Sequence, residues 1–522
     1  TDGGTAAADG RRAGHAAAAW LGLAPHPAPE GPPDRGASES GHPYPVFAGP
    51  HAKAFVDLDE DLTVDDLAHA VQEGYDDAEL LKRYATVGMG PSQGKHASVN
   101  ALRVLARLTG RSLGDSRLTT ARPFASPVPM AHLAGRGFTP VQRTPAHDRH
   151  ERLGAEMMYA GTWLRPARYP RSGLDREGCI DAEARDVRSQ VGLIDVGTLG
   201  KLEISGADAV RFLERIYTGR FAKLRVGMTR YAVMCDETGV VVDDGVIGRL
   251  GAERFYVSTT SSGADQVYRE MQRWAAVWRL DVTLVNATST YGAFNIAGPY
   301  ARQVLAGLTD VDLSAEAFPY LGIREGAVAG APARLSRVGF VGELGYEVHV
   351  PAGFAAGVWD ELLRAGERHG IVPFGVEAQR LLRLEKGHLI VSQDTDGLTD
   401  PFEAHLGWAV KLDKPFFVGK RSLEILAARA RRRRLAGFEL PPDAPVPLEN
   451  HLIVDDGREI VGRVTSVGRS GAVGRTIGLA YVPESAAEIG SALQIKGEGG
   501  EIIAARVAAT PFFDPEGVRL RS

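Results

Sequence analysis

The spacing of apolar and polar residues changes along the chain, and with it the predicted element. Apolar residues three and four apart favour a helix, whereas strict alternation favours a strand. An Ala-rich run predicts one helix over 3–22. By itself this helix has no partner to pack against, so we interpret it as the last helix of a domain cut from a larger subunit. The Pro- and Gly-rich stretch 23–51 predicts a linker.

A small helical module is predicted over 52–118. Thr63 and Asp66 have the spacing of a capping box and open a helix that runs through Ala70. Two more helices follow, separated by a glycine-rich turn, and a Pro-rich connector spans 119–150. The apolar positions expected to line these two helices are Leu80, Leu81 and Tyr84 in the first, and Val99, Leu102, Leu105 and Leu108 in the second.

The body, 151–421, mixes strand and helix patterns. Its clearest unit is a hairpin, in which two β-rich runs flank the turn 236–239. We also expect a capping box formed by Ser205 and Asp208 before helix 209–216, and Pro299 at the first position of another helix.

A C-terminal domain over 422–522 begins with a helix ending in Arg431–Arg434 and continues in short, evenly spaced strands. Such spacing indicates a closed or nearly closed β-domain. The predicted fold class is therefore α+β: a helical module, a multi-domain body and a β-barrel-like end.

Composition narrows the functional classes. At about 150 residues per domain, 522 residues predict three or four domains. A net charge of −5, from 60 basic and 65 acidic residues, argues against a nucleic-acid partner. No segment is expected to span a membrane or to act as a signal peptide. The two cysteines, Cys179 and Cys235, disfavour disulfides and metal sites and suit the cytoplasm.

Two adjacent acids, Asp243 and Asp244, lie in a β-branched run. Because side chains on a strand alternate, the two carboxylates must point to opposite faces, and one of them is expected to face the interior. The alternative is that both lie solvated at a strand end.

A second acidic strand contains Glu347 and His349 on one face, after three glycines around Glu343. A carboxylate there can bind an aminopyrimidine edge, or it can simply face solvent. Arg380, on a predicted helix with Arg383 and Glu385, is by itself weak evidence for a site.

The glycine-rich turn from Thr86 to Lys95 has two readings. It can cradle an anion at a helix start, with Lys95 adding charge, or it can pack two helices together. His147 and His150 have no metal-ligand pattern, and we expect both on the surface.

Taken in order, the motifs of the body resemble the aminomethyltransferase (glycine-cleavage T-protein) family of tetrahydrofolate proteins. They are Gly192-Leu-Ile-Asp-Val196, Arg230-Tyr-Ala-Val-Met-Cys, Val240-Val-Val-Asp-Asp244, Val341-Gly-Glu-Leu-Gly-Tyr-Glu347, Arg380-Leu-Leu-Arg-Leu-Glu385 and Gly407-Trp-Ala-Val-Lys-Leu. The resemblance runs from about residue 152 to the end.

The N-terminal motifs resemble the α subunits of heterotetrameric sarcosine oxidases. They are Ala54-Phe-Val-Asp-Leu-Asp, Leu80-Leu-Lys-Arg-Tyr and Gly88-Met-Gly-Pro-Ser-Gln-Gly-Lys95. Relatives of this module bind a [2Fe–2S] cluster through four cysteines, which correspond here to Asp57, Asp59, Ser92 and Ala97, so no cluster is expected. The resemblance also implies that helix 3–22 ends a dinucleotide-binding region whose NAD or FAD site belongs to a missing N-terminal part.

The resemblance assigns site residues one by one. Asp244 becomes the catalytic carboxylate beside folate N10, Tyr231 the cavity wall, Glu347 and Arg380 the pterin contacts, and Trp408 the pocket lining. Ser92, Gln93, Gly94 and Lys95 are assigned to the phosphate of FMN at a partner interface. Two departures are Phe340, where relatives often have Tyr, and Gly197-Thr198 in place of a Ser-His pair.

The function implied is the tetrahydrofolate-binding part of a sarcosine oxidase. A flavin-bearing β subunit oxidises an N-methyl amine, small subunits complete the hetero-oligomer, and this chain captures the one-carbon unit as 5,10-methylene-tetrahydrofolate. Two alternatives are a standalone folate-dependent aminomethyl- or methyltransferase and a non-catalytic folate-binding scaffold.

Overall fold

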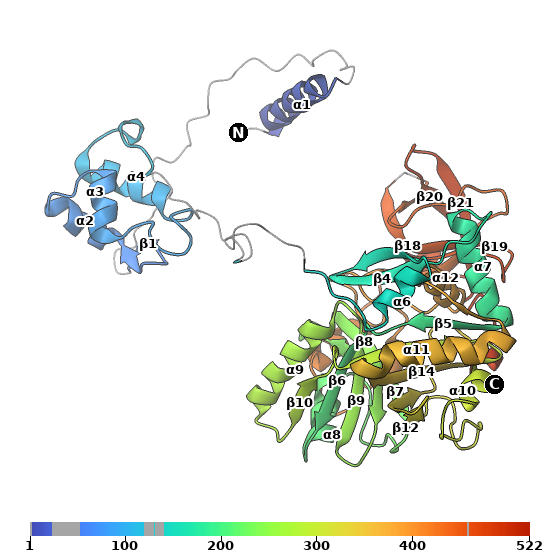
Figure 1. The fold of residues 1–522 in the computed structure, drawn as a ribbon. Coiled ribbons are helices and arrows are strands. Elements are labelled where there is room, and N and C mark those ends of the chain that lie inside the picture. Colours follow the sequence, from blue (N-terminus) through green and yellow to red (C-terminus); the bar gives the residue numbers. More distant parts are fainter. Residues whose placement is uncertain (1–2, 23–52, 120–129, 131–139, 457–458) are drawn as a thin grey trace. The chain divides into compact units, whose positions relative to one another are not determined.

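The computed structural model describes residues 3–22, 53–119, 130, 140–456 and 459–522. Its contacts divide the chain into two units, Thr1–Phe138 and Thr139–Ser522, and each is described by itself (Figure 1). The predicted linker 23–51 and most of the connector 119–150 lie outside the described residues. No helix in the described ranges is long and apolar enough to cross a membrane.

The first unit begins with helix α1, Gly3–Trp20, as the Ala-rich run predicts. A separate helical module follows. Its elements are β1 (Phe55–Asp57), β2 (Leu62–Thr63), α2 (Val64–Gln72), α3 (Ala78–Ala85), α4 (Ser98–Thr109) and η1 (Leu113–Asp115). The Thr63–Asp66 capping box is confirmed, since each side chain accepts the other residue's backbone N–H.

The expected apolar stripes of α3 and α4 are only partly right. Leu81, Leu102 and Leu105 are buried, but Leu80, Tyr84, Val99 and Leu108 are exposed. Helix α3 packs through Leu81 and its alanines, and α4 through alanines and Val104 beside its leucines, so the buried face of each is rotated from the predicted one. The buried residues of the module are Val56, Leu67, Ala70, Leu81, Val87, Ala97, Ala101, Val104 and Leu105.

The second unit contains a five-stranded antiparallel sheet in the order β10-β6-β9-β8-β7. Helices α8 and α9 bury their apolar sides against it. The bounds are β6 (Gly200–Ser205), α8 (Ala209–Ile216), β7 (Thr229–Cys235), β8 (Val241–Arg249), β9 (Arg254–Thr259), α9 (Ala264–Trp278) and β10 (Thr283–Asn286). The predicted hairpin is confirmed as β7–β8.

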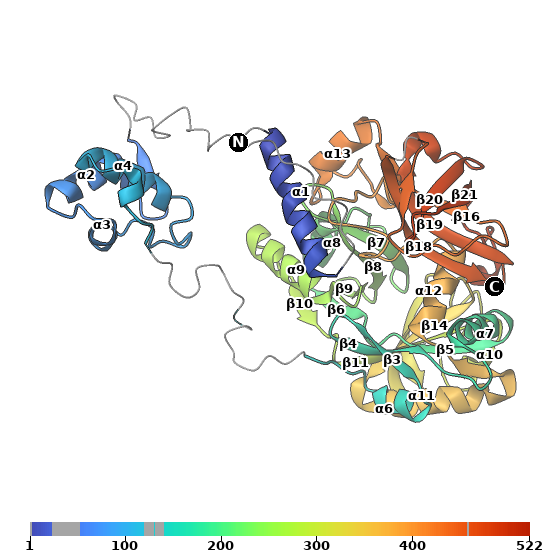
Figure 2. The same cartoon turned by 90° about the horizontal axis from the view of Figure 1, so that it is seen from above.

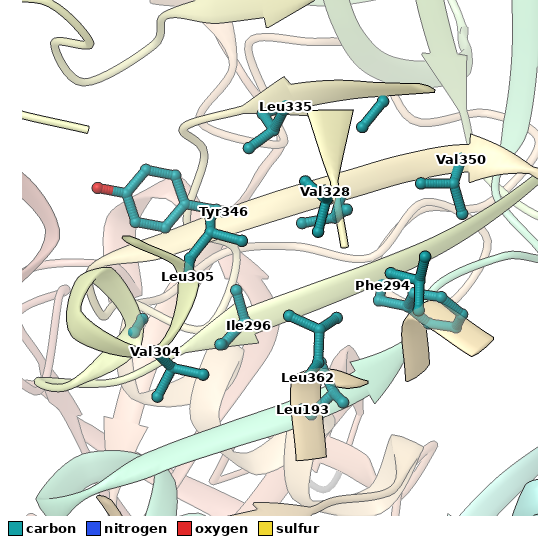
Figure 3. Close-up of a cluster of buried hydrophobic side chains, with 14 of the residues drawn as sticks. Leu193, Phe294, Ile296, Val304, Leu305, Val328, Leu335, Tyr346, Val350 and Leu362 are labelled. Carbon is teal, nitrogen blue, oxygen red and sulfur yellow. The ribbon is translucent and has the colours of Figure 1, made fainter. Parts of the chain in front are cut away.

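A six-stranded sheet lies beside it, in the order β12-β13-β14-β11-β5-β15, and its β5–β15 pair is parallel. Its core gathers Leu193, Phe294, Ile296, Tyr346 and Leu362 (Figure 3). The bounds are β5 (Val191–Asp195), β11 (Tyr291–Ala297), α10 (Ala301–Ala306), β12 (Ile323–Val328), β13 (Ala331–Ser336), β14 (Gly345–Pro351), α11 (Ala352–Gly366), η2 (Glu367–His369) and β15 (Ile371–Pro373).

Further segments connect this sheet to the C-terminal domain. They are α6 (His147–Arg152), β3 (Glu156–Ala160), β4 (Trp163–Arg168), α7 (Arg176–Ser189), α12 (Val376–Glu385), η3 (Gly407–Ala409) and α13 (Lys420–Ala428). Helices α7 and α12 contact each other. Helix α12 also contacts β18 (Ile460–Ser470), a strand of the C-terminal barrel described next (Figure 2).

The C-terminal strands close into a barrel, β16-β19-β18-β17-β20-β21, which confirms the predicted β-domain. The bounds are β16 (Arg433–Glu439), β17 (Leu452–Val454), β18 (Ile460–Ser470), β19 (Arg475–Pro483), η4 (Glu484–Ala486), β20 (Ala492–Lys496), β21 (Ile502–Ala508) and α14 (Val518–Arg521).

Three local expectations are wrong. Helix α13 ends at Ala428, and Arg433 already belongs to β16. Helix α8 begins after Asp208 without a side-chain cap, and Pro299 precedes α10, which begins at Ala301. In each case tertiary contacts outweigh the local signal.

A buried ion network joins these parts. The Arg188 guanidinium of α7 donates to Glu385 Oε2 of α12 at 2.9 Å and to Glu343 Oε1 at 2.8 Å. Ser470 of the barrel donates to the other Glu385 oxygen at 2.6 Å, and Arg519 near the C-terminus pairs with Glu343. The network therefore ties helix, sheet, barrel and C-terminus together.

Truncation of Arg188 should destabilise the second unit strongly. Arg188→Ala leaves Glu385 and Glu343 buried with one cation fewer, which costs about 3–5 kcal/mol. Arg185→Ala, on the same helix but 68% exposed, is the matched control and should cost less than about 1 kcal/mol. Calorimetric unfolding of both variants tests this, and equal unfolding temperatures would contradict the role of the network.

Candidate functional site

The central feature is a hydrogen-bonded pair on the β7–β8 hairpin. The Tyr231 hydroxyl donates to Asp244 Oδ2 at 2.6 Å. In the antiparallel register Val233 pairs with Asp244, so Tyr231 is the diagonal neighbour of Asp244 on the same face. The hairpin thus brings these two assigned residues, which lie on its two strands, into contact.

The surroundings tune the acidity of this pair. Burial raises the pKa of Asp244 to about 6, while the hydrogen bond from Tyr231 acts in the opposite direction. Burial and the Asp244 charge hold the pKa of Tyr231 well above its usual value, so the phenol remains a donor. Asp244 is therefore ionised at neutral pH, and its pKa lies close enough to neutral pH for the carboxylate to accept a proton.

Trp408 covers the hydroxyphenyl ring of Tyr231. The two ring centroids are 5.4 Å apart at an interplanar angle of 27°. Trp408 comes from η3, far along the sequence, and its side chain remains 62% exposed. The exposed indole can stack on a flat ring of a ligand. The buried carboxylate beside it can then bind a polar group on the edge of that ring.

Asp243 points away from Asp244, as strand alternation predicts. It is 2% exposed, and its Oδ2 accepts the Thr260 amide at 3.2 Å. Burial, helped by the Asp244 charge, raises the pKa of Asp243 to about 7. The alternative of two solvated acids at a strand end is wrong, because both residues lie within β8.

Glu347 lies on β14 in the other sheet and is not freely solvated. Its side chain is 17% exposed, and its Oε2 is 3.3 Å from His349 Nε2. Tyr346, Val348 and Val350 fill the core on the opposite face, as predicted. Glu347 thus presents a partly accessible carboxylate held by a buried imidazole.

Lys201 is a buried group that sequence reasoning missed. Its ammonium donates to the carbonyl oxygens of Gly197 and Leu199, both at 2.8 Å. Burial lowers the pKa of Lys201 to about 8, against the charges of Asp195 and Glu347. No local pattern indicates its burial, since an alternating strand normally turns a lysine to solvent.

Arg380 lies on α12. The ion-pair partners that the described structure gives it are Glu377, at 3.5 Å, and Glu449. Glu449 also lines a polar cavity of about 390 Å³, together with Gln393 and Thr465. No contact in the described residues joins Arg380 to Asp244 or Glu347, so its pterin role stays a prediction. Phe340 stacks on His388, with centroids 5.8 Å apart.

The glycine-rich turn is held by carboxylates. Asp57 Oδ2 accepts the Gly88 amide at 2.7 Å, and Asp59 Oδ2 accepts the Ser92 amide at 2.8 Å. Gly94 has φ +72°, and a Cβ there would lie 2.1 Å from Ser98 Oγ. The turn therefore packs tightly against α4, which supports the structural reading. Contact of Ser92–Lys95 with a flavin phosphate stays a prediction.

The expectation that His147 and His150 lie on the surface is wrong. Both are buried, and His150 Nε2 is 2.9 Å from Asp195 Oδ2 while its Nδ1 is 2.9 Å from the Tyr169 hydroxyl. The imidazole of His150 also meets the edge of Trp359. Partners distant in sequence make this burial possible, so no local pattern reveals it.

Comparisons with known proteins identify the family of the chain. The profile of the GCVT N-terminal domain matches residues 146–414, and that of the glycine cleavage T-protein C-terminal barrel domain matches 433–514. The chain belongs to the glycine cleavage T-protein family. The sarcosine oxidase A3 domain profile matches 51–136, in the helical module.

Individual relatives of this T-protein family member fall into two groups. The aminomethyltransferase of Halothermothrix orenii is 32% identical over 68% of this chain and 95% of its own length. Sarcosine oxidase subunit alpha of Rhizobium meliloti is 39% identical over 92% of this chain but 50% of its own length. The chain thus spans about half the length of the sarcosine oxidase relatives.

A solved structure supports the fold. The glycine cleavage system aminomethyltransferase T from Bartonella henselae aligns with a TM-score of 0.65 and 25% identity, over 72% of this chain and 99% of its own. The T-protein body and barrel are therefore shared, as the motifs of the body predicted.

Removal of the Tyr231 hydroxyl should raise the pKa of Asp244. Tyr231→Phe deletes the hydrogen bond that favours the charged carboxylate, so protonation should occur at higher pH, by about one pH unit. The measurement is an infrared titration of each chain, from which the titration of the same chain carrying Asp244→Asn is subtracted. The difference reports the protonation of the Asp244 carboxyl. Tyr268→Phe is the control, because it removes a hydroxyl that donates to Leu284 O instead of to Asp244. An unchanged Asp244 pKa in Tyr231→Phe would refute the effect of the hydrogen bond.

Proposed function

We propose that this chain binds tetrahydrofolate between Asp244, Tyr231, Trp408 and Glu347, with Arg380 at its margin, and captures a one-carbon unit there. The observation that carries the proposal is the Tyr231–Asp244 hydrogen bond beside an exposed indole, in a chain of the T-protein family. A buried carboxylate with a pKa of about 6 and an aromatic platform suit a reduced pterin with basic nitrogens.

Bound tetrahydrofolate supplies two nucleophilic nitrogens, N5 and N10, which take up a unit at the formaldehyde level as 5,10-methylene-tetrahydrofolate with loss of water. Asp244 accepts a proton from N10 or stabilises positive charge there. The hydrogen bond from Tyr231 favours the ionised form of Asp244. Trp408 stacks on the folate, and Glu347 accepts hydrogen bonds from the pterin edge. General-base help of this kind is typically worth about 10²–10⁴-fold.

We further propose that the one-carbon unit comes from oxidation of an N-methyl amine such as sarcosine. Relatives that align over 92% and 89% of this chain are named sarcosine oxidase subunit alpha, and the profile of a sarcosine oxidase domain matches residues 51–136. A flavin-bearing β subunit would supply the oxidation, with small subunits completing the assembly. Cys179 and Cys235 are both free, which suits a cytoplasmic location.

The Asp244 role is tested by a matched pair on one strand. Asp244→Asn should lower the rate of 5,10-methylene-tetrahydrofolate formation from formaldehyde and tetrahydrofolate by about 10²-fold or more. Asp243→Asn, one residue away on the other face, should retain a rate close to that of the unchanged chain. Equal rates in both variants would refute the assignment.

The flavin assignment has its own test. Lys95→Ala should reduce FMN retention in the purified hetero-oligomer, because the phosphate loses a cation. Arg83→Ala, on exposed α3, is the control and should leave flavin content unchanged. Full FMN content and normal assembly in Lys95→Ala would contradict the role. A colourless chain that still transfers one-carbon units would indicate a standalone transferase instead.

A further inference from the structure

The two sheets of the body meet at a polar seam. Arg334 of β13 pairs with Glu203 of β6, and its guanidinium lies 4.8 Å from the ring centroid of Tyr256 on β9. The Tyr256 hydroxyl in turn lies 3.1 Å from His349 Nδ1 on β14. The seam thus joins the sheet that carries Asp244 to the sheet that carries Glu347.

His349 is the centre of a three-member relay. It is 1% exposed, its Nδ1 faces Tyr256 and its Nε2 faces Glu347 Oε2 at 3.3 Å. An ionised carboxylate can only accept a hydrogen bond, so Nε2 must carry the proton. In a neutral imidazole Nδ1 is then the acceptor, and the Tyr256 hydroxyl must donate to it.

The surroundings agree with this tautomer. Burial lowers the pKa of His349, and Lys201 and Arg334 act in the same direction, so the ring is neutral in spite of Glu347. Burial also holds the pKa of Tyr256 well above its usual value, which keeps its hydroxyl protonated. The imidazole and the phenol therefore have the protonation states that the hydrogen bonds require.

We propose that His349 is a positioning residue for the pterin-binding carboxylate of Glu347, held in its tautomer and orientation by Tyr256. The proposal rests on the proposed function, in which Glu347 contacts the pterin. Tyr256 pairs with Gly248 across β8–β9, four residues from Asp244 on the same strand. The relay therefore fixes the direction of one ligand-binding acid from β9, the strand next to the one that carries the other acid.

The variants at position 349 separate donation from packing. Gln can place an N–H near the position of Nε2 and should keep tetrahydrofolate affinity within about threefold. Asn reaches only the position of Nδ1, and Leu reaches neither polar contact. His349→Asn and His349→Leu should raise the Kd for tetrahydrofolate about tenfold, measured by calorimetric titration of the full chain. In the one-carbon assay the same two variants should raise KM with little change in kcat.

A double variant distinguishes positioning from a structural role. If His349 acts through Glu347, His349→Leu should add little to the loss caused by Glu347→Gln, because the two changes remove one interaction. Additive losses would overturn the proposal, as would His349→Gln binding as weakly as His349→Leu at an unchanged unfolding temperature. Wild-type affinity in His349→Leu, with weak binding in Glu347→Gln, would overturn the relay but leave the proposed function intact. Unchanged affinity in both Glu347→Gln and Asp244→Asn would overturn the proposed function itself, and the relay with it.

Discussion

The second unit depends on one buried cation, the guanidinium of Arg188. It lies between the carboxylates of Glu385 and Glu343. Glu385 also accepts a hydrogen bond from Ser470 of the barrel, and Glu343 also pairs with Arg519 near the C-terminus. Charges removed from water are costly unless every partner is in place. Helix, sheet, barrel and chain end must therefore assemble together, and none can shift far without leaving a charge unpaired.

This frame explains how a site can be built from distant segments. Asp244 comes from one sheet, Glu347 from the other, and Trp408 from a short turn before the barrel. No single element contains all three of these residues, so any site that they share depends on the assembled unit, in which the Arg188 network and the seam at His349 join the parts. Precision at the site is a property of the assembled unit rather than of any one motif.

The sequence predicts what is local. The β7–β8 hairpin, the opposite faces of Asp243 and Asp244 and the strands of the barrel follow from alternation and turn residues, and all are present. What it could not predict depends on distant partners. His150 is buried because Asp195 receives it, and Lys201 because carbonyl oxygens surround its ammonium. Local polarity points both side chains to solvent, and only the tertiary fold supplies the groups that offset their burial.

In the helical module, two carboxylates join the segment of the first strand to the glycine-rich turn. In relatives of this module, the resemblance implies that cysteines link the first strand to the glycine-rich turn through iron. Here Asp57 and Asp59 join the same two segments by accepting the amides of Gly88 and Ser92. Hydrogen bonds to a carboxylate are stronger than neutral ones, and Asp57 is 2% exposed, so water competes little for its oxygens. Two carboxylates thus hold the glycine-rich turn in place.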